Sequence, residues 1–320
     1  MGSDQSLFDY DQVSLRFYHT ALRHECLLPN VGIDDSLWKY SGLDSNAVLK
    51  EQSSLLTTLP SYTQMLGTNL AALSSVPNAV GLGALVIALI IEVILKTNTN
   101  PNDQSYAMFR RVFGEEKASS VRDTISEYLM THRAFMNNEQ RLQTELRRLE
   151  GQLRGHLIIL RNSLLYDRQM SSRGFKIWVN GASFQIQMLI HEARLKSQTG
   201  EDVSNHLMSI NNFIDEHLRD LEKLRNTYKT YKIETTRIYP TQSCSRDGCY
   251  FSRCMLGDSE ANCQKEHYPG FPCEDSRIVK LYVDHVFSKY ELLLSLKNYF
   301  LDVQRNLNIV IHQHHSFSLS

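Results

Sequence analysis

The sequence predicts an all-α protein: an elongated bundle of long amphipathic helices with an N-terminal hydrophobic helical hairpin and a Cys-rich loop. Three observations predict this fold class. Leucines recur at helical spacing through residues 118–170, which contain no proline. The forty residues 52–91 contain no charged residue and no histidine, and five of the six cysteines lie between positions 244 and 273. Seven prolines in 320 residues favour long helices over a sandwich or a barrel.

The composition excludes some classes of function. A net charge of −1 and the absence of a run of Lys and Arg argue against nucleic-acid binding, which needs a basic face to neutralise phosphates. With 42% hydrophobic residues, the chain can bury a core and is not disordered by composition. We therefore expect a folded chain with no nucleic-acid partner.

The first predicted unit, residues 1–44, is an N-terminal helix followed by a loop. Apolar residues recur at helical spacing between positions 11 and 26, and Pro29 closes that segment. Residues 30–44 are expected to form a polar loop that carries Trp38. The first apolar residues are interrupted by Asp9, Asp11 and Arg16, so this segment does not resemble a secretory leader.

The N-terminus fits the pattern for lipidation. Met1-Gly2-Ser3-Asp4-Gln5-Ser6 matches M-G-x-x-x-[ST], which predicts myristoylation of Gly2 after removal of the methionine. The alternative, favoured equally, is that the sequence matches this pattern by chance. One myristoyl chain holds a membrane only marginally, so an anchor of this kind needs a second signal, and the uncharged stretch can supply it.

Residues 45–96 predict a hydrophobic helical hairpin. An amphipathic arm ends before the break at residues 76–78, and the second arm, the candidate membrane segment 79–95, is apolar on every side and carries one charge, Glu92. Such a helix is buried in a large core or in lipid. The candidate membrane residues are Ala79, Gly83, Leu85, Leu89, Ile91 and Glu92.

Length alone does not choose between core and lipid for this segment. Residues 78–91 span about 21 Å as a helix, against about 30 Å for a bilayer interior. Membrane contact is the favoured interpretation, because the rest of the chain is expected to form too small a core to bury such a helix. The alternative is the buried central hairpin of a soluble bundle.

A polar linker and short helix at 97–117, with Pro101 and Gly114, separate the hairpin from a long-helix bundle at 118–240. The leucines of the first long helix are spaced 4, 3, 4, 4, 3 and 4, which predicts a nearly straight seam. Further long helices are expected at 172–197, 202–239 and 275–312, the last within a C-terminal unit of helix and tail at 276–320. The seam leucines are Leu142, Leu146, Leu149, Leu153, Leu157, Leu160 and Leu164.

The apolar stripes of these long helices favour packing within one chain, and homo-oligomerisation through the seams is the less favoured alternative.

Residues 241–275 are predicted to be a Cys-rich loop. The disulfide candidates are Cys26, Cys244, Cys249, Cys254, Cys263 and Cys273, and the weak metal candidates are Cys254, Cys263, His267 and Cys273. Paired C-x2-C knuckles are missing, so a zinc site rests on cysteine density alone. Disulfides rank slightly ahead of zinc, and free or lipidated thiols come third. Disulfides imply an oxidising compartment, whereas myristoylation implies the cytosol.

Catalytic motifs are missing from the sequence. It contains no G-x-x-x-x-G-K-[ST], no G-x-S-x-G and no H-E-x-x-H, and histidines such as His132, His156, His191 and His217 are expected to line helix faces.

We therefore expect a non-enzymatic, membrane-associated helical protein on the cytoplasmic face, with no cofactor and no evident small-molecule substrate. Its lipid partner is engaged by the hairpin, in a pore-forming or membrane-remodelling role. The alternative is a soluble helical scaffold whose hairpin is core.

Overall fold

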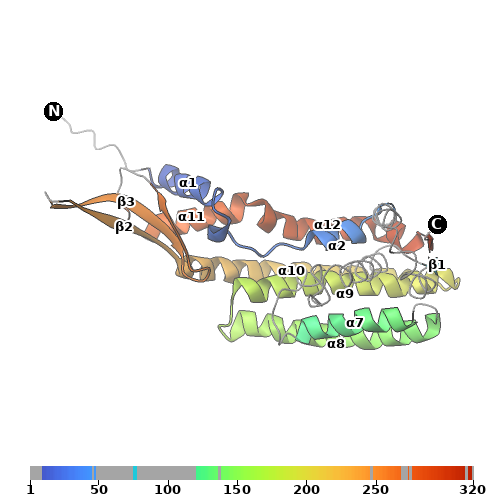
Figure 1. Cartoon of the computed structure of the whole chain (residues 1–320). Helices are drawn as coiled ribbons and strands as arrows, with labels where there is room; N and C mark the ends of the chain where they lie inside the picture. The colour runs from blue at the N-terminus through green and yellow to red at the C-terminus, as the bar shows by residue number, and fades with distance from the viewer. Residues whose placement is uncertain are drawn as a thin grey trace, which may run out of the picture.

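The computed structural model describes residues 9–44, 47, 75–77, 120–135, 138–245, 248–267, 273, 276–313 and 316–318. This part of the chain is mainly helical and elongated, and a small three-stranded antiparallel sheet extends from one end (Figure 1). The prediction of a long helical bundle is confirmed. The prediction of an all-α protein is wrong, because the sheet occupies most of the expected Cys-rich loop.

The helices have the following bounds: α1 Tyr10–Ala21, η1 Glu25–Leu27, α2 Asp35–Ser41, α7 Ser120–Phe135, α8 Glu139–Tyr166, α9 Ser172–Gln198, α10 Ser204–Thr235, α11 Ser276–Lys289 and α12 Glu291–His312. The strands are β1 Ser75–Pro77, β2 Thr236–Ser245, β3 Gly248–Asp258, β4 Cys263–His267 and β5 Ser316–Ser318. β1 pairs with β5, which joins the segment at residue 75 to the C-terminal tail, where the sequence predicts a break between two helical arms.

Helix α9 is the centre of the bundle. It packs against α2, α7, α8, α10 and α12, and it is buried along most of its length. Helices α7 and α8 lie on one side of it and α12 on the other (Figure 1). Gly181 permits this close packing, because a Cβ at that position would lie 2.8 Å from the side chains of Leu157 and Val121.

The leucine seam of α8 is confirmed as core. Leu160 is partly buried, and the other six seam leucines are buried against a common cluster with α7 and α9. Full burial of a leucine contributes about 1.5–3 kcal/mol, so this seam is a major part of what holds the bundle together. The described seam is filled by helices of the same chain.

Two predicted helices are broken in the structure. The stretch 118–170 forms α7 and α8, because the side chain of Asn138 accepts a hydrogen bond from the Arg141 N–H at 3.1 Å and caps a new helix. The stretch 275–312 forms α11 and α12, with extended backbone at Tyr290 between them. Short-range periodicity continues through both breaks, which is why the sequence did not reveal them.

The expected loop at residues 30–44 contains helix α2. The Asp34 side chain accepts a hydrogen bond from the Ser36 N–H at 2.9 Å and caps this helix. Trp38 packs edge-on against Tyr299 of α12, with ring centroids 5.0 Å apart. The N-terminal segment is thereby attached to the bundle, which a polar loop would not achieve.

The three-stranded sheet replaces both the end of a predicted helix and the predicted loop at 241–275. Helix α10 ends at Thr235, not at residue 239, and the chain continues directly into β2. β3 lies between β2 and β4, and Ile238 of β2 is paired in register with Leu256 of β3. Both side chains are buried, so the sheet has its own contact with the core.

Candidate functional site

The residues predicted to contact a membrane lie outside the described part of the chain. This holds for the lipidation candidate Gly2 and for the six candidates of segment 79–95. The hydrophobic hairpin at 45–96 and the linker at 97–117 also fall outside it, apart from residue 47 and β1. Among the helices that the structure describes, none is both long and apolar enough to cross a bilayer. The membrane hypothesis therefore depends on the sequence of 52–91.

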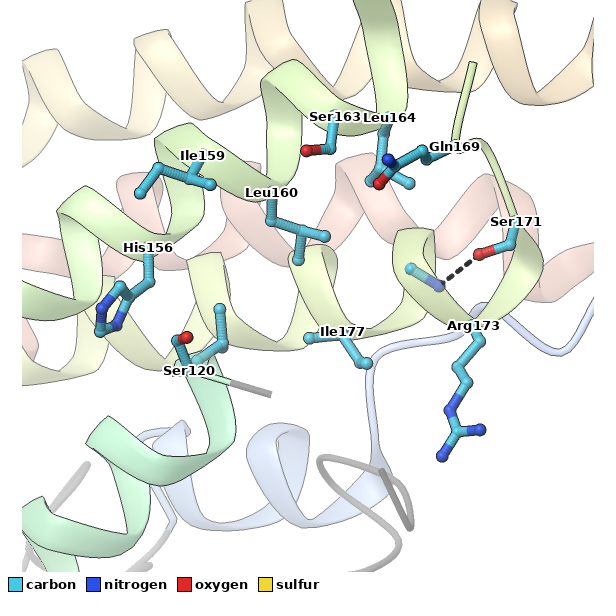
Figure 2. A pocket seen from close by; sticks show the side chains of 12 residues that line it. Ser120, His156, Ile159, Leu160, Ser163, Leu164, Gln169, Ser171, Arg173 and Ile177 are labelled. Carbon is cyan, nitrogen blue, oxygen red and sulfur yellow. Dashed lines mark hydrogen bonds between the residues drawn. The ribbon is translucent and has the colours of Figure 1, made fainter. Parts of the chain in front are cut away.

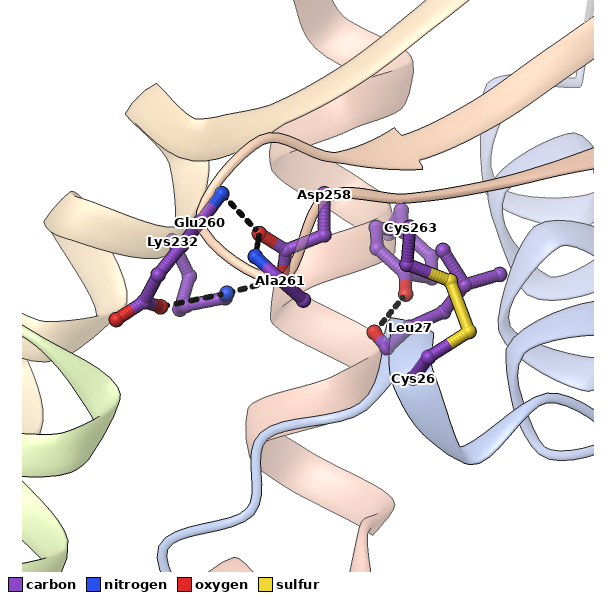
Figure 3. The surroundings of a disulfide bond; sticks show 8 residues. Cys26, Leu27, Lys232, Asp258, Glu260, Ala261 and Cys263 are labelled. Carbon is purple, nitrogen blue, oxygen red and sulfur yellow. Dashed lines mark hydrogen bonds and ion pairs between the residues drawn. A yellow bond between two sulfur atoms is a disulfide. The ribbon is translucent and has the colours of Figure 1, made fainter.

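Four of the predicted disulfide cysteines form two disulfides. Cys26 of η1 is bonded to Cys263 of β4, with Cα atoms 5.9 Å apart, and this bond links the N-terminal segment to the sheet (Figure 3). Cys254 is bonded to Cys273, with Cα atoms 5.7 Å apart. Cys244 and Cys249 stand opposite each other in the β2–β3 register, and their side chains lie outside the described residues.

The weak metal site is not assembled. Its three cysteines are in disulfides, so they provide no thiolate ligands. The fourth candidate, His267, places Nδ1 2.7 Å from Thr20 Oγ1 and its ring 4.5 Å from that of Phe17. Within the described ranges no group of three or more His, Cys, Asp or Glu side chains is placed to hold a metal ion.

A buried ion cluster joins the sheet to the bundle. Lys232 of α10 is only 4% exposed and donates hydrogen bonds to Asp258 and, at 3.3 Å, to Glu260 (Figure 3). Glu260 also accepts from the Ser172 N–H at 2.7 Å, at the start of α9. One cation is therefore surrounded by two carboxylates, which satisfies the requirement that a buried charge be paired.

Two tyrosines next to this cluster are held in the neutral form. Burial raises the pKa of Tyr228 well above its ordinary value, and the Tyr228 hydroxyl lies 2.6 Å from Ser172 Oγ. Burial, followed by the nearby carboxylate of Glu260, raises the pKa of Tyr231 to about 12. A third negative charge is thus kept out of the sheet junction, where it would oppose the two carboxylates.

A cavity of about 420 Å³ lies between α8 and the starts of α7 and α9 (Figure 2). Its size is in the range of small-molecule sites. His156 Nδ1 lies 2.9 Å from Thr124 Oγ1, but that hydroxyl donates its proton to the Ser120 carbonyl. Thr124 therefore accepts from His156, and the pair is not a nucleophile activated by a base. The cavity is lined by Ser120, Val121, His156, Ile159, Leu160, Ser163, Leu164, Gln169, Ser171, Arg173, Gly174 and Ile177.

A second buried polar group lies at the opposite end of α9 from the sheet. His191 Nδ1 is 2.9 Å from the Tyr128 hydroxyl of α7, and its ring centroid is 5.3 Å from that of His132. Burial lowers the pKa of His132 to about 4. Burial also lowers the pKa of His191 well below its ordinary value, and the charges of His132 and Arg194 lower it further.

Arg194 carries a positive charge in this group at neutral pH. One Nη donates to the Gln313 carbonyl at 2.8 Å, while Nε and the other Nη have no hydrogen-bond partner. Burial lowers the pKa of Arg194 to about 10, so the side chain stays charged at neutral pH. No carboxylate of the described chain pairs with it, which distinguishes this cation from Lys232.

A third buried histidine, His217 of α10, has a hydrogen-bond partner. Its Nε2 lies 3.0 Å from Gln185 Oε1, and Gln185 donates to Glu150 at 2.7 Å. Burial is the largest cause that lowers the pKa of His217 to about 4. The sequence predicted that these histidines line helix faces; it gave no signal that three of them are buried, because burial depends on which helix covers them.

Comparison with models of protein families, with curated proteins and with solved structures finds no match for this chain. Function is therefore inferred from the residues and contacts described above.

Proposed function

We propose that this protein is a non-enzymatic, membrane-associated helical protein whose apolar stretch 52–91 inserts in or lies on a bilayer. The observation that carries the proposal is the absence of any charge or histidine from forty consecutive residues in a chain that is 22% charged. The seam leucines of α8 support it, because six of the seven are buried against helices of the same chain and only Leu160 is partly exposed. An apolar helix is stable in lipid without further protein contacts.

The two disulfides bear on the compartment. Disulfides persist in oxidising surroundings and are rare in the cytosol. Cys26–Cys263 and Cys254–Cys273 therefore favour a bilayer surface on the oxidising side over the cytoplasmic face. In that case the lipidation match at Gly2 is a chance match. Intact mass before and after alkylation, without reduction, distinguishes the two compartments, because a cytosolic protein would take up a label on every cysteine.

Vesicle flotation of the full-length protein tests membrane association. We expect the wild-type chain to float with vesicles and the double variant Leu85→Arg with Leu89→Arg to stay in the soluble fraction, because each arginine at a bilayer centre costs about 2.5–3.5 kcal/mol or more. Release of an encapsulated dye would extend the proposal to pore formation, whereas binding without release would limit it to anchoring.

The matched control adds two arginines to the described surface instead. Met208 and Ile309 are 61% and 54% exposed, so Met208→Arg with Ile309→Arg should fold and float like the wild type. If the Leu85 and Leu89 variant unfolds without any membrane present while the control does not, the stretch is structural core and the proposal is wrong.

The second candidate is a helical scaffold, favoured by a groove of about 790 Å³ between α10 and α12. Leucines such as Leu218, Leu293 and Leu296 line it, and Arg219 and Lys297 stand among the charged residues around them. An amphipathic partner helix can lie in a groove of this kind. Stable full-length protein that neither binds vesicles nor releases dye would favour this candidate.

A further inference from the structure

Two buried histidine rings form part of the contact between α7 and α9. His132 of α7 and His191 of α9 are each 2% exposed, and their ring centroids are 5.3 Å apart. Tyr128, one turn before His132, places its hydroxyl 2.9 Å from His191 Nδ1. His132 Nδ1 has no hydrogen-bond partner. The contact is therefore suited to neutral rings, since nothing accepts a hydrogen bond from a second proton on His132.

The groups around this pair do not compensate a positive charge. On α9, Arg194 is a buried cation whose charge lowers the pKa of His191. Glu192, the next residue after His191, is bonded to Arg147 of α8 at 2.5 Å. On α7 itself Tyr128 is neutral, because burial raises its pKa well above the ordinary value.

The groups that the remaining neighbouring elements place near the two rings do not supply an unpaired negative charge either. Where α9 faces α10, Lys196 Nζ lies 2.6 Å from Nε2 of His206 and 3.4 Å from Oε1 of Glu192. The Glu192 carboxylate is therefore shared between Lys196 and Arg147. After the end of α12, Gln313 offers its carbonyl to Arg194. Among the described residues, then, no free carboxylate faces the two imidazoles.

We propose that the His132–His191 contact is acid-sensitive: a proton taken up by either ring below about pH 6 separates α7 from α9, and the apolar stretch that precedes α7 in the sequence enters a bilayer after this separation. The separation of α7 follows from the described contact alone. Its last step rests on the proposed function, because α7 is the first described helix after residues 52–91.

The direction of the pH effect follows from linkage. The pKa of His132 is lowered to about 4 in the folded chain, against 6.5 when exposed, so a released state binds the proton more strongly. The contact is fully stable above pH 6.5 and weakens as pH falls from there towards 4. At pH 5, which is 1.5 units below the pKa of an exposed ring and still above the folded value, this difference favours release by about 30-fold for His132 alone, because each pKa unit is a factor of ten. His191, shifted in the same direction, adds to it.

Hydrogen exchange of the full-length protein at pH 7 and pH 5 tests the contact. After correction for intrinsic exchange rates, we expect the protection of α7 to fall by about 30-fold or more, and that of strand β3, which contains no histidine and lies next to Lys232, to fall much less. An equal fall in both segments would mean global unfolding and would overturn the inference. So would unchanged protection of α7.

Three variants separate titration from packing. His132→Phe keeps an aromatic ring without a titratable group, and His132→Leu serves if the larger ring does not fold. Either variant should reduce the acid effect on α7 by about 30-fold, whereas His19→Gln, at an exposed histidine of α1, should behave like the wild type. A His132 variant whose α7 responds to acid as the wild type does would contradict the inference.

Vesicle flotation at the same two pH values, with vesicles of neutral and anionic phospholipid, distinguishes this inference from the proposed function. Release of α7 at pH 5 with acid-dependent flotation supports both. Release of α7 without flotation at either pH would remove the last step and the proposed function, and leave the acid-sensitive contact. Flotation with unchanged α7 protection would overturn the acid-sensitive contact and leave the proposed function.

Discussion

The two ends of helix α9 bury polar groups in different ways. At its start, next to the sheet, Lys232 is surrounded by Asp258 and Glu260, and a disulfide holds the sheet to the N-terminal segment. Towards its other end, His132, His191 and Arg194 are buried with no carboxylate of the described chain paired to them. A buried charge that is paired is compensated by its counter-charges, whereas a neutral ring without a counter-charge takes up a proton at the expense of packing.

The largest expected effect comes from the core on which both ends depend. Leu149 and Leu153 of α8 are fully buried, and each Leu→Ala change costs about 2–5 kcal/mol. The double variant should lose about 4–10 kcal/mol, which is comparable to the whole stability of a typical domain. Circular dichroism with urea should show largely unfolded protein. A cooperative transition at the wild-type midpoint would mean that the two ends are stable independently of this seam.

Removing the cation at the sheet end should come next. Lys232→Met leaves the buried Asp258 and the partly buried Glu260 without a counter-charge, and breaking a buried pair in this way costs about 3–5 kcal/mol. Chemical denaturation at pH 7 measures the loss. Lys229→Met is the matched control, because Lys229 makes a half-exposed ion pair with Asp284; it should cost less than about 1 kcal/mol. Equal losses would remove the distinction between the two ends.

Much of the bundle follows from the sequence, since burial repeats with the helical period. Leu142 to Leu164 are core because their spacing keeps them on one face of α8. The sheet does not follow from it, because β2 continues directly from α10 and its partner strand starts at Gly248, with no alternating pattern strong enough to outweigh the helix signal. High cysteine density at 244–273 predicted cross-links there, but not which cysteines pair.

The site at the α7–α9 contact could not be predicted from the sequence. His132 and His191 are fifty-nine positions apart, and only the packing of α7 on α9 brings their rings together. A histidine on an amphipathic helix has the same local pattern whether it is exposed, bonded or buried without a partner. The lack of a partner at His132 Nδ1 is a property of the tertiary structure.

The disulfide at the sheet end should contribute somewhat less than the buried cation. Cys26 and Cys263 are separated by 237 positions, and the loss of a native disulfide costs about 2–5 kcal/mol. Cys26→Ala with Cys263→Ala should lower the urea midpoint at pH 7 and increase exchange in β4 more than in α7. If α7 is affected more, the disulfide does not act locally and the two ends are coupled.

A smaller effect is expected at pH 5 for His217, which lies between the two ends. Its pKa is lowered from 6.5 to about 4, so its contribution is complete above pH 6.5 and is lost as pH falls towards 4. The loss at pH 5 is about 2 kcal/mol by this shift. Denaturation of His217→Gln at pH 7 and pH 5 should show a pH dependence smaller by that amount. Because the change is read as a difference between two pH values, any fixed cost of the substitution cancels.

The smallest effect is expected on the outer surface of the sheet, where a paired charge is not buried. Arg253 Nη1 lies 2.7 Å from Glu266 Oε2, but the two side chains are 41% and 48% exposed. Water screens such a pair, so Glu266→Gln should cost at most about 1 kcal/mol, and less as salt is added. Denaturation at low and high ionic strength measures this. A loss as large as that of Lys232→Met, insensitive to salt, would show that pairing alone stabilises the sheet end; a small, salt-sensitive loss would show that burial of the pair is what makes Lys232 important there.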